Sequence, residues 1–146
     1  NIKFKNTNNT KGNYLAVKGH DNKESFASSK LNPLNYFELK TKKLGLYFIK
    51  NDSVFPTIRP LNFKNEDWIS NKKYLKFKIV DKESGIKKYK GKINGKWMLF
   101  EYEYKKNLIS YEFDSYYLSK SKNEVEIEVE DMVGNTLIKT FTFYRN

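Results

Sequence analysis

The sequence contains no cysteine and only one histidine, His20. Without cysteine, disulfide bonds, thiolate metal sites and cysteine nucleophiles are all excluded. A single imidazole also argues against a metal centre built on several histidines and against a serine hydrolase with a histidine partner. The composition therefore predicts a chain that is not an enzyme, and we expect no catalytic residue, no cofactor and no metal ion.

Long apolar runs and a leader segment are missing as well. No stretch reaches the roughly 18 apolar residues that a membrane-spanning helix needs, so we expect no transmembrane segment. The chain begins at Asn1, with neither an initiating methionine nor a basic and apolar leader. We therefore expect a processed chain or a fragment of a longer protein.

Aromatic residues and lysine are abundant instead. The chain has 11 tyrosines, 11 phenylalanines and 2 tryptophans, and such side chains favour strands over helices. Its formal charge of +11 comes from 28 basic and 17 acidic residues. The only arginines are Arg59 and Arg145, whereas proteins that read nucleic acids depend on bidentate arginine contacts. We expect no nucleic-acid partner.

A boundary between two parts is predicted near Phe55. Pro56 and Pro60 impose an extended path and lack the amide that a central strand needs, which is typical of a linker running into an edge strand. Residues 1–55 are expected to form a partial β domain or docking strands. Strands are expected near residues 2–4, 14–17, 36–39 and 44–49, with a loop over 20–35.

Residues 56–146 alternate apolar and polar side chains with the period of a strand. Strands are expected over residues 75–79, 86–93, 96–102, 108–113, 124–130 and 137–143. Asn94 and Gly95 favour a type I′ hairpin turn. Regularly spaced strands without an amphipathic helix predict an immunoglobulin-like β-sandwich, so the fold class is all-β. The expected core residues are Phe77, Ile79, Val125, Ile127, Val129 and Phe141.

Acidic residues lie in three segments that could have either a structural or a chemical role. Residues 81–86 and 131–135 favour tight turns, because aspartate bonds to nearby amides and glycine supplies positive φ. The alternative is a Ca²⁺ site at one end of the sandwich, with these oxygen ligands: Asp81, Glu83, Asp131 and Asn135. Four glutamates over residues 124–130 are expected to face neighbouring lysines on an outer surface, rather than to form the carboxylate pair of a glycosidase.

Aromatic side chains supply the candidate binding surface. Trp97 follows a hairpin turn and is expected to cover the sandwich interior. The expected surface for a sugar or a protein consists of Tyr116, Tyr117, Tyr102 and Tyr104, because tyrosine combines apolar area with a polar group. His20 is expected in a solvated loop.

Several of these stretches resemble one known family. The stretches are residues 44–49 with Asp52, 56–63, 68–70, 75–81, 84–86, Tyr89, 94–97, 101–102, 131–135, Phe141 and Phe143. The stretches from residue 56 onward resemble the C-terminal immunoglobulin-like region that follows the catalytic domain in lysostaphin-type zinc endopeptidases, the peptidoglycan hydrolases of Gram-negative bacteria and especially of the Bacteroidetes. Residues 44–49 with Asp52 are similar to the closing strand of the β domain that precedes this region in those proteins. The resemblance covers residues 44–146.

The resemblance implies a role without catalysis. The zinc ligands of that family are histidines and an aspartate in a separate domain, and no residue here matches them. We therefore expect a non-catalytic cell-envelope module, in the periplasm or at the outer membrane, that positions a larger protein on peptidoglycan or on an envelope protein. The alternative is a protein–protein interaction subunit of an outer-membrane or secretion assembly.

Overall fold

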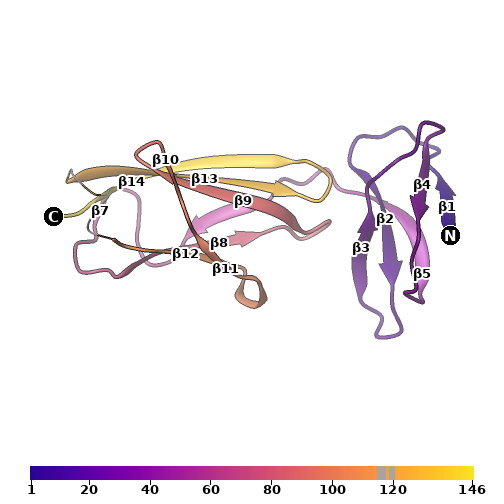
Figure 1. The fold of residues 1–146 in the computed structure, drawn as a ribbon, viewed down its shortest axis with the longest axis horizontal. Coiled ribbons are helices and arrows are strands. Elements are labelled where there is room, and N and C mark those ends of the chain that lie inside the picture. The colour runs from indigo at the N-terminus through magenta and orange to yellow at the C-terminus, as the bar shows by residue number, and fades with distance from the viewer. Residues whose placement is uncertain (115–117, 119–120) are drawn as a thin grey trace.

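The computed structural model describes residues 1–114, 118 and 121–146 (Figure 1). Within these residues the chain forms strands and one short 3₁₀ turn, η1 (Tyr104–Lys106). The predicted fold class is confirmed: the chain is all-β, with an immunoglobulin-like β-sandwich preceded by a smaller group of strands. No helix in the described part is long and apolar enough to cross a membrane.

The first group of strands forms two small sheets. β1 (Ile2–Lys5) pairs with β4 (Tyr36–Leu39), while β2 (Asn13–Lys18) lies between β3 (Glu24–Ser28) and β5 (Leu46–Asn51). Four consecutive residues of β2 are buried, which means that both faces of this central strand are covered. We call these five strands the N-terminal unit.

The loop expected over residues 20–35 is wrong where β3 forms. β3 has one large apolar side chain, Phe26, so it lacks the alternation that identifies a strand. Its backbone pairs with β2, and the ring of Phe26 stacks on Tyr14 with centroids 5.6 Å apart. Pairing with a neighbour, rather than local sequence, determines this strand.

One sheet of the sandwich has five strands. In spatial order they are β10 (Lys96–Met98), β9 (Ile86–Ile93), β13 (Lys122–Asp131), β14 (Thr136–Tyr144) and β7 (Asp67–Trp68). β7 runs parallel to β14, and the other neighbours are antiparallel. The turn between β9 and β10 has φ of 50° at Asn94 and 78° at Gly95, so the predicted hairpin is confirmed.

The facing sheet has four strands in the order β11 (Glu101–Glu103), β12 (Leu108–Glu112), β8 (Tyr74–Val80) and β6 (Thr57–Pro60). Among the described strands β6 pairs only with β8, which confirms the edge strand predicted from the prolines.

The single strand expected over residues 96–102 is wrong, because the chain changes sheets within it. β10 pairs with β9 in one sheet and β11 pairs with β12 in the other. Between them, Phe100 is buried in the core while Leu99 stays exposed. The crossing ends one hydrogen-bonded ladder and starts another.

The core lies between the two sheets of the sandwich. Five of the six expected core side chains are buried: Phe77, Ile79, Val125, Ile127 and Val129. Phe141 is only partly buried, and its ring packs 5.4 Å from that of Phe77. The interior also takes in Phe100, Ile109 and Phe143 from the strands on either side.

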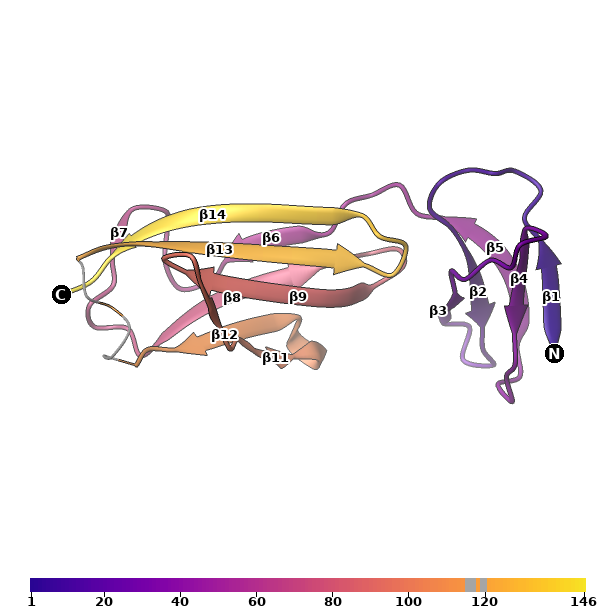
Figure 2. The ribbon, with the colours of Figure 1, turned by 45° about the horizontal axis from the view of Figure 1, so that its top comes forward.

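The two units lie end to end (Figures 1 and 2). The β8–β9 and β13–β14 turns occupy the end of the sandwich that faces the N-terminal unit, while β1 and β4 lie on the far side of that unit. The N-terminus and the C-terminus lie at opposite ends of the molecule. A junction is thereby formed where the linker and the two turns meet.

Candidate functional site

Three aspartates meet at the junction. Asp52 follows β5, Asp81 follows β8, and Asp131 ends β13. One carboxylate oxygen from each lies within 4.8 Å of the others. The sequence-based hypothesis brought Asp81 and Asp131 together, and the structure does so, but it did not include Asp52. The signal for Asp52 was its place between the last strand of one unit and the proline-bearing linker.

Asp81 is held by the tight turn expected from the sequence. Its Oδ2 accepts hydrogen bonds from the backbone amides of Glu83 at 3.2 Å and Gly85 at 2.7 Å. Gly85 has φ of +93°, a conformation that favours glycine. The turn thus fixes one oxygen of Asp81 and leaves the other for a different contact.

Asp131 is held in the same way by the second turn. Its Oδ1 accepts from the amides of Val133 at 2.9 Å and Asn135 at 2.8 Å, and its Oδ2 accepts from the Asn135 side-chain amide at 2.7 Å. Gly134 has φ of +96°. Asn135, expected as an alternative ligand, therefore acts here as a donor.

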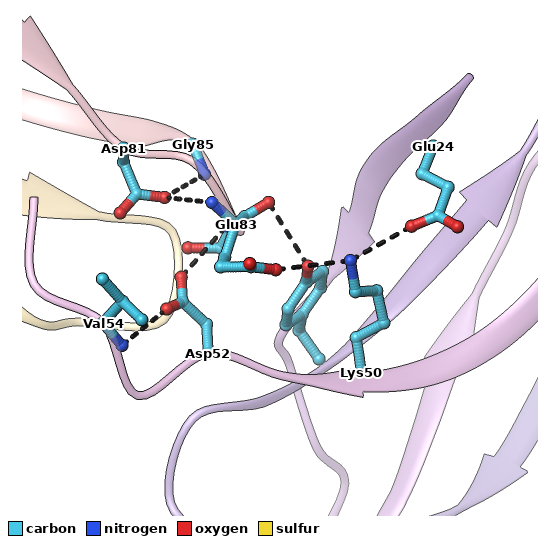
Figure 3. A network of polar contacts seen from close by, with 9 residues as sticks. Glu24, Lys50, Asp52, Val54, Asp81, Glu83 and Gly85 are labelled. Carbon is cyan, nitrogen blue, oxygen red and sulfur yellow. Dashed lines mark hydrogen bonds and ion pairs between the residues drawn. The ribbon is translucent and has the colours of Figure 1, made fainter.

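Asp52 ties the linker to the sandwich (Figure 3). It is 1% exposed, and its Oδ2 accepts from the backbone amide of Ser84 at 3.0 Å. Its Oδ1 accepts from the amide of Val54, also at 3.0 Å. Asn135 Nδ2 donates to the Asp52 carbonyl oxygen at 3.3 Å. A buried carboxylate from outside the sandwich is thereby bonded into the β8–β9 turn.

The three carboxylates have no cationic partner in the described part of the chain, since none of the ion pairs there includes them. Burial raises the pKa of Asp81, and the negative charges of Asp52 and Asp131 raise it further. The amides of Gly85 and Glu83 oppose this rise in the pKa of Asp81. The junction therefore concentrates negative charge that its neighbours only partly offset.

Lysine bridges the two units beside this cluster (Figure 3). Lys50 Nζ lies 3.1 Å from Glu24 Oε2 and 3.3 Å from Glu83 Oε2. The bond to Glu24 is the main cause that raises the pKa of Lys50. The Tyr14 hydroxyl donates to the Glu83 carbonyl oxygen at 3.3 Å. Glu83, expected as an alternative metal ligand, is thus exposed and paired with Lys50 rather than part of the cluster.

A groove lies at the edge of the sandwich, where β10 and β11 pass from one sheet to the other. Its volume is about 470 Å³. The lining consists of Tyr74, Lys96, Trp97, Met98, Leu99, Glu101, Ser110, Tyr111, Glu112 and Asp114. The lining combines apolar side chains with polar and charged groups, which is the usual make-up of a ligand site.

Trp97 is on the groove wall and not in the core, so its expected role was wrong. It is 63% exposed, and no other described aromatic ring stacks on it. Trp68 is similarly exposed, at 59%, but its ring stacks on Tyr144 with centroids 5.2 Å apart. Phe100 fills the interior position expected for Trp97.

The predicted tyrosine surface is divided. Tyr116 and Tyr117 lie outside the described residues. Tyr102 is partly buried and packs edge-on against Tyr89, with centroids 5.3 Å apart. Tyr104 opens η1 and is 69% exposed. Of these two tyrosines, Tyr104 is therefore exposed to solvent, whereas Tyr102 packs against the core.

Two of the four glutamates of β13, Glu126 and Glu130, pair with lysines, as expected. Glu130 carboxylate oxygens lie 3.0 Å from Lys87 Nζ and 2.8 Å from Lys88 Nζ. Glu126 pairs with Lys92 at 3.3 Å. These ion pairs connect β9 and β13 along one surface of the sheet. His20, elsewhere in the chain, is exposed in a turn, as expected.

Comparison with known proteins defines the fold only. No protein-family model and no curated protein matches the chain. Among solved structures it is similar to the endo-β-1,4-mannanase from Thermotoga petrophila, with a TM-score of 0.54 and 13% identity over 65% of this chain and 20% of that chain. The chain spans about a fifth of the length of that enzyme.

Two other solved structures are similar at lower TM-scores. CopC from Methylosinus trichosporium OB3b has a TM-score of 0.46 and 13% identity, over 62% of this chain and 94% of that chain. The fibronectin(III)-like modules of Clostridium thermocellum CbhA have a TM-score of 0.48 and 10% identity, over 96% of this chain and 81% of that chain.

Proposed function

We propose that this chain is a non-catalytic cell-envelope module whose edge groove holds a larger protein on peptidoglycan. The observation that carries the proposal is the exposed, unstacked ring of Trp97 in a groove of about 470 Å³. An exposed indole offers a flat apolar face on which a sugar ring stacks, with a polar N–H at its edge. The charged groups of the lining supply hydrogen bonds for sugar hydroxyls and amides.

Three features of the groove favour binding over hydrolysis. Its acidic residues, Glu101, Glu112 and Asp114, are exposed, whereas a glycosidase needs one carboxyl kept protonated by burial. Glu112 is also engaged by Lys73 at 3.0 Å. The chain has a single histidine, which disfavours a zinc peptidase site.

The envelope location is proposed from the sequence resemblance. The stretches over residues 44–146 resemble the immunoglobulin-like region of lysostaphin-type endopeptidases and the last strand before it, and the catalytic domain of those proteins is separate. On this proposal the chain is the accessory part of such a protein, or a relative that kept the sandwich. The place of action is then the periplasm or the outer membrane.

Sedimentation with purified peptidoglycan tests the groove. We expect Trp97→Ala to lower the bound fraction at least fivefold in 0.5 M salt, where attraction between the basic chain and an anionic polymer is screened. Trp68→Ala is the matched control, because Trp68 is equally exposed but lies on β7, outside the groove lining. Binding that vanishes in salt and is the same in all variants would refute specific binding in the groove. Charge attraction would then be the whole cause of binding.

The tyrosine prediction is tested in the same assay. Tyr116→Ala combined with Tyr117→Ala should also lower salt-resistant binding if these residues extend the surface. Unchanged binding in this double variant, beside a loss in Trp97→Ala, would limit the contact to the groove.

Catalysis is tested by zymography. We expect no clearing of peptidoglycan by this chain, with or without added zinc. A cleared zone that a chelator abolishes would contradict the non-catalytic role.

A second candidate is a protein–protein interaction subunit of an outer-membrane or secretion assembly. Exposed leucines on the N-terminal unit favour it, because Leu34, Leu44 and Leu46 are all more than half exposed. Two results together would replace the first candidate with this one. Peptidoglycan is not bound at any salt concentration, and the parent chain captures an envelope protein that the double variant Leu44→Ser with Leu46→Ser does not capture.

A further inference from the structure

The aspartate cluster at the junction places charge where the protein alone does not neutralise it. Asp52 and Asp131 are buried, and one oxygen of each lies within 4.8 Å of an oxygen of Asp81. Burying a carboxylate without a cation or a full set of donors is costly. The backbone amides of two turns and the Asn135 amide provide donors, but no lysine or arginine of the described chain pairs with the cluster.

A second, independent observation concerns oxygen atoms without a partner. Asp81 Oδ1 and Ser84 Oγ are both buried atoms, and neither has a hydrogen-bond partner. Ser84 as a whole is 4% exposed, and its own amide is bonded to Asp52 Oδ2 at 3.0 Å. Ser84 thus belongs to the turn that carries Asp81 and is bonded to Asp52 through its backbone. Because buried polar atoms are nearly always partnered, the two unpartnered oxygens of the β8–β9 turn favour the binding of a ligand here.

We propose that Asp52, Asp81 and Asp131 bind a divalent cation at the junction, and that the cation is Ca²⁺. The available ligands are carboxylate and hydroxyl oxygens, which are the donors that Ca²⁺ takes, whereas Zn²⁺ prefers nitrogen and sulfur. Ca²⁺–oxygen bonds of about 2.3–2.6 Å allow two ligands to be roughly 5 Å apart across the ion. The 4.8 Å limit on the cluster fits that span.

Calcium is favoured over magnesium because the three ligands come from separate turns and a linker. Asp81 and Asp131 come from two tight turns, and Asp52 comes from the linker. Mg²⁺ demands a near-ideal octahedron with bonds of about 2.0–2.1 Å, while Ca²⁺ accepts varied numbers and angles of ligands. The ion binds one aspartate from outside the sandwich and two from within it, so its binding joins the N-terminal unit to the sandwich.

This inference does not depend on the groove or its ligand. It predicts an affinity in the range of extracellular calcium modules, with Kd of about 10⁻⁴–10⁻³ M. At 10 mM Ca²⁺ the folding equilibrium constant should then rise roughly 10- to 100-fold. Thermal unfolding of the full chain, first freed of metal with a chelator, will show this as a higher Tm.

One variant removes the charge with little change of shape. Asp81→Asn keeps an oxygen for the turn amides and should abolish the rise in Tm with Ca²⁺. Asp21→Asn is the matched control, since Asp21 also accepts a backbone amide in a turn, from Lys23 at 3.1 Å, but lies in an exposed loop. The control should keep the full response.

If Asp81→Asn fails to fold, direct measurement of Ca²⁺ binding to the parent chain still tests the site. Isothermal titration with Ca²⁺ alone should give one ion per chain. No binding at 10 mM Ca²⁺, or an undiminished Tm shift in Asp81→Asn, would overturn the site. An equal response to Mg²⁺ would overturn the assignment of calcium.

Discussion

Gly91 lies under an aromatic ring in the core. A Cβ added at this position would overlap two ring carbons of Phe100, the side chain that enters the core where the chain crosses between the sheets. We expect Gly91→Ala to lower the free energy of unfolding by about 1–3 kcal/mol, because the ring must move in a filled core. Urea denaturation monitored by tryptophan fluorescence will measure this loss.

Two further variants separate this clash from a general effect of alanine. Lys90→Ala changes an exposed neighbour on the same strand and should stay within about 0.5 kcal/mol of the parent. Phe100→Leu should cost less in the Gly91→Ala background than alone, because the smaller side chain relieves the overlap. Strict additivity of the two losses would contradict the contact.

Tyr89 is predicted to weaken folding at alkaline pH. Burial raises the pKa of its hydroxyl, the charge of Glu101 adds to the rise, and the hydroxyl donates to the Phe100 carbonyl at 2.7 Å. The unfolded chain ionises this tyrosine near pH 10, while the folded chain holds its proton longer. Its stabilising contribution is therefore complete below about pH 10 and is lost as the pH rises through the raised pKa.

The measurement compares urea midpoints at pH 8 and pH 11. Tyr89→Phe should be less stable than the parent at pH 8 by about 0.5–1.5 kcal/mol, the value of one hydrogen bond. Between pH 8 and pH 11, however, its free energy of unfolding should fall by less than that of the parent. Tyr104→Phe, at an exposed position, should follow the parent throughout. An equal alkaline loss in Tyr89→Phe and the parent would show that Tyr89 does not carry it.

Local and distant contacts explain which site residues the sequence could predict. The turns that hold Asp81 and Asp131 are encoded within five residues, so both positions and their shared end of the sandwich could be inferred. Asp52 reaches them from another unit, a contact that no local pattern encodes. Trp97 was misplaced for a similar reason, because the change of sheet after Met98 decides which side chain enters the core.

At the scale of elements, we expect β13 to be highly sensitive to substitution. It lies between β9 and β14, and Ile127 in its middle is fully buried. We expect Ile127→Ala to cost about 2–5 kcal/mol through lost burial and the cavity left behind. Chemical denaturation will measure it, with exposed Glu124→Ala on the same strand as the control. An unchanged midpoint for Ile127→Ala would mean that the register of β13 is wrong.

Strands with strict alternation could be predicted, and strands without it could not. β8 and β13 alternate throughout and lie near their expected positions. β3 and the two-residue β7 lack such a pattern and exist because a neighbour offers backbone partners. The break between β10 and β11 was also hidden, since both halves favour a strand and only their partners differ.

At the scale of the molecule, we expect the stability of the N-terminal unit to depend on its contact with the sandwich. Two and three strands make small sheets that are marginal alone. We expect Lys50→Gln, which removes the bridge between Glu24 and Glu83, to destabilise this unit by about 0.2–1 kcal/mol, with a smaller loss in 0.5 M NaCl.

Two probes distinguish the units. Both tryptophans lie in the sandwich, whereas far-ultraviolet circular dichroism reports every strand. The parent should show one midpoint by both probes, and Lys50→Gln should unfold earlier by dichroism than by fluorescence. Lys3→Gln, which removes a pair with Glu38 inside the N-terminal unit, should have a smaller effect, because the side chain of Lys3 is more exposed than that of Lys50. Separate midpoints in the parent would contradict the coupling.

The position of the two ends at opposite poles determines how the molecule would bear tension (Figure 1). β6 and β14 both run away from the junction, and a pull between the ends would slide each along its neighbour. Their hydrogen bonds stand across the strands and would be strained together rather than one after another. β14 pairs with β13 over nine residue pairs, but β6 pairs with β8 over only four. Under load, the junction and β6 would therefore yield first, while the long β13–β14 ladder kept the rest of the sandwich closed.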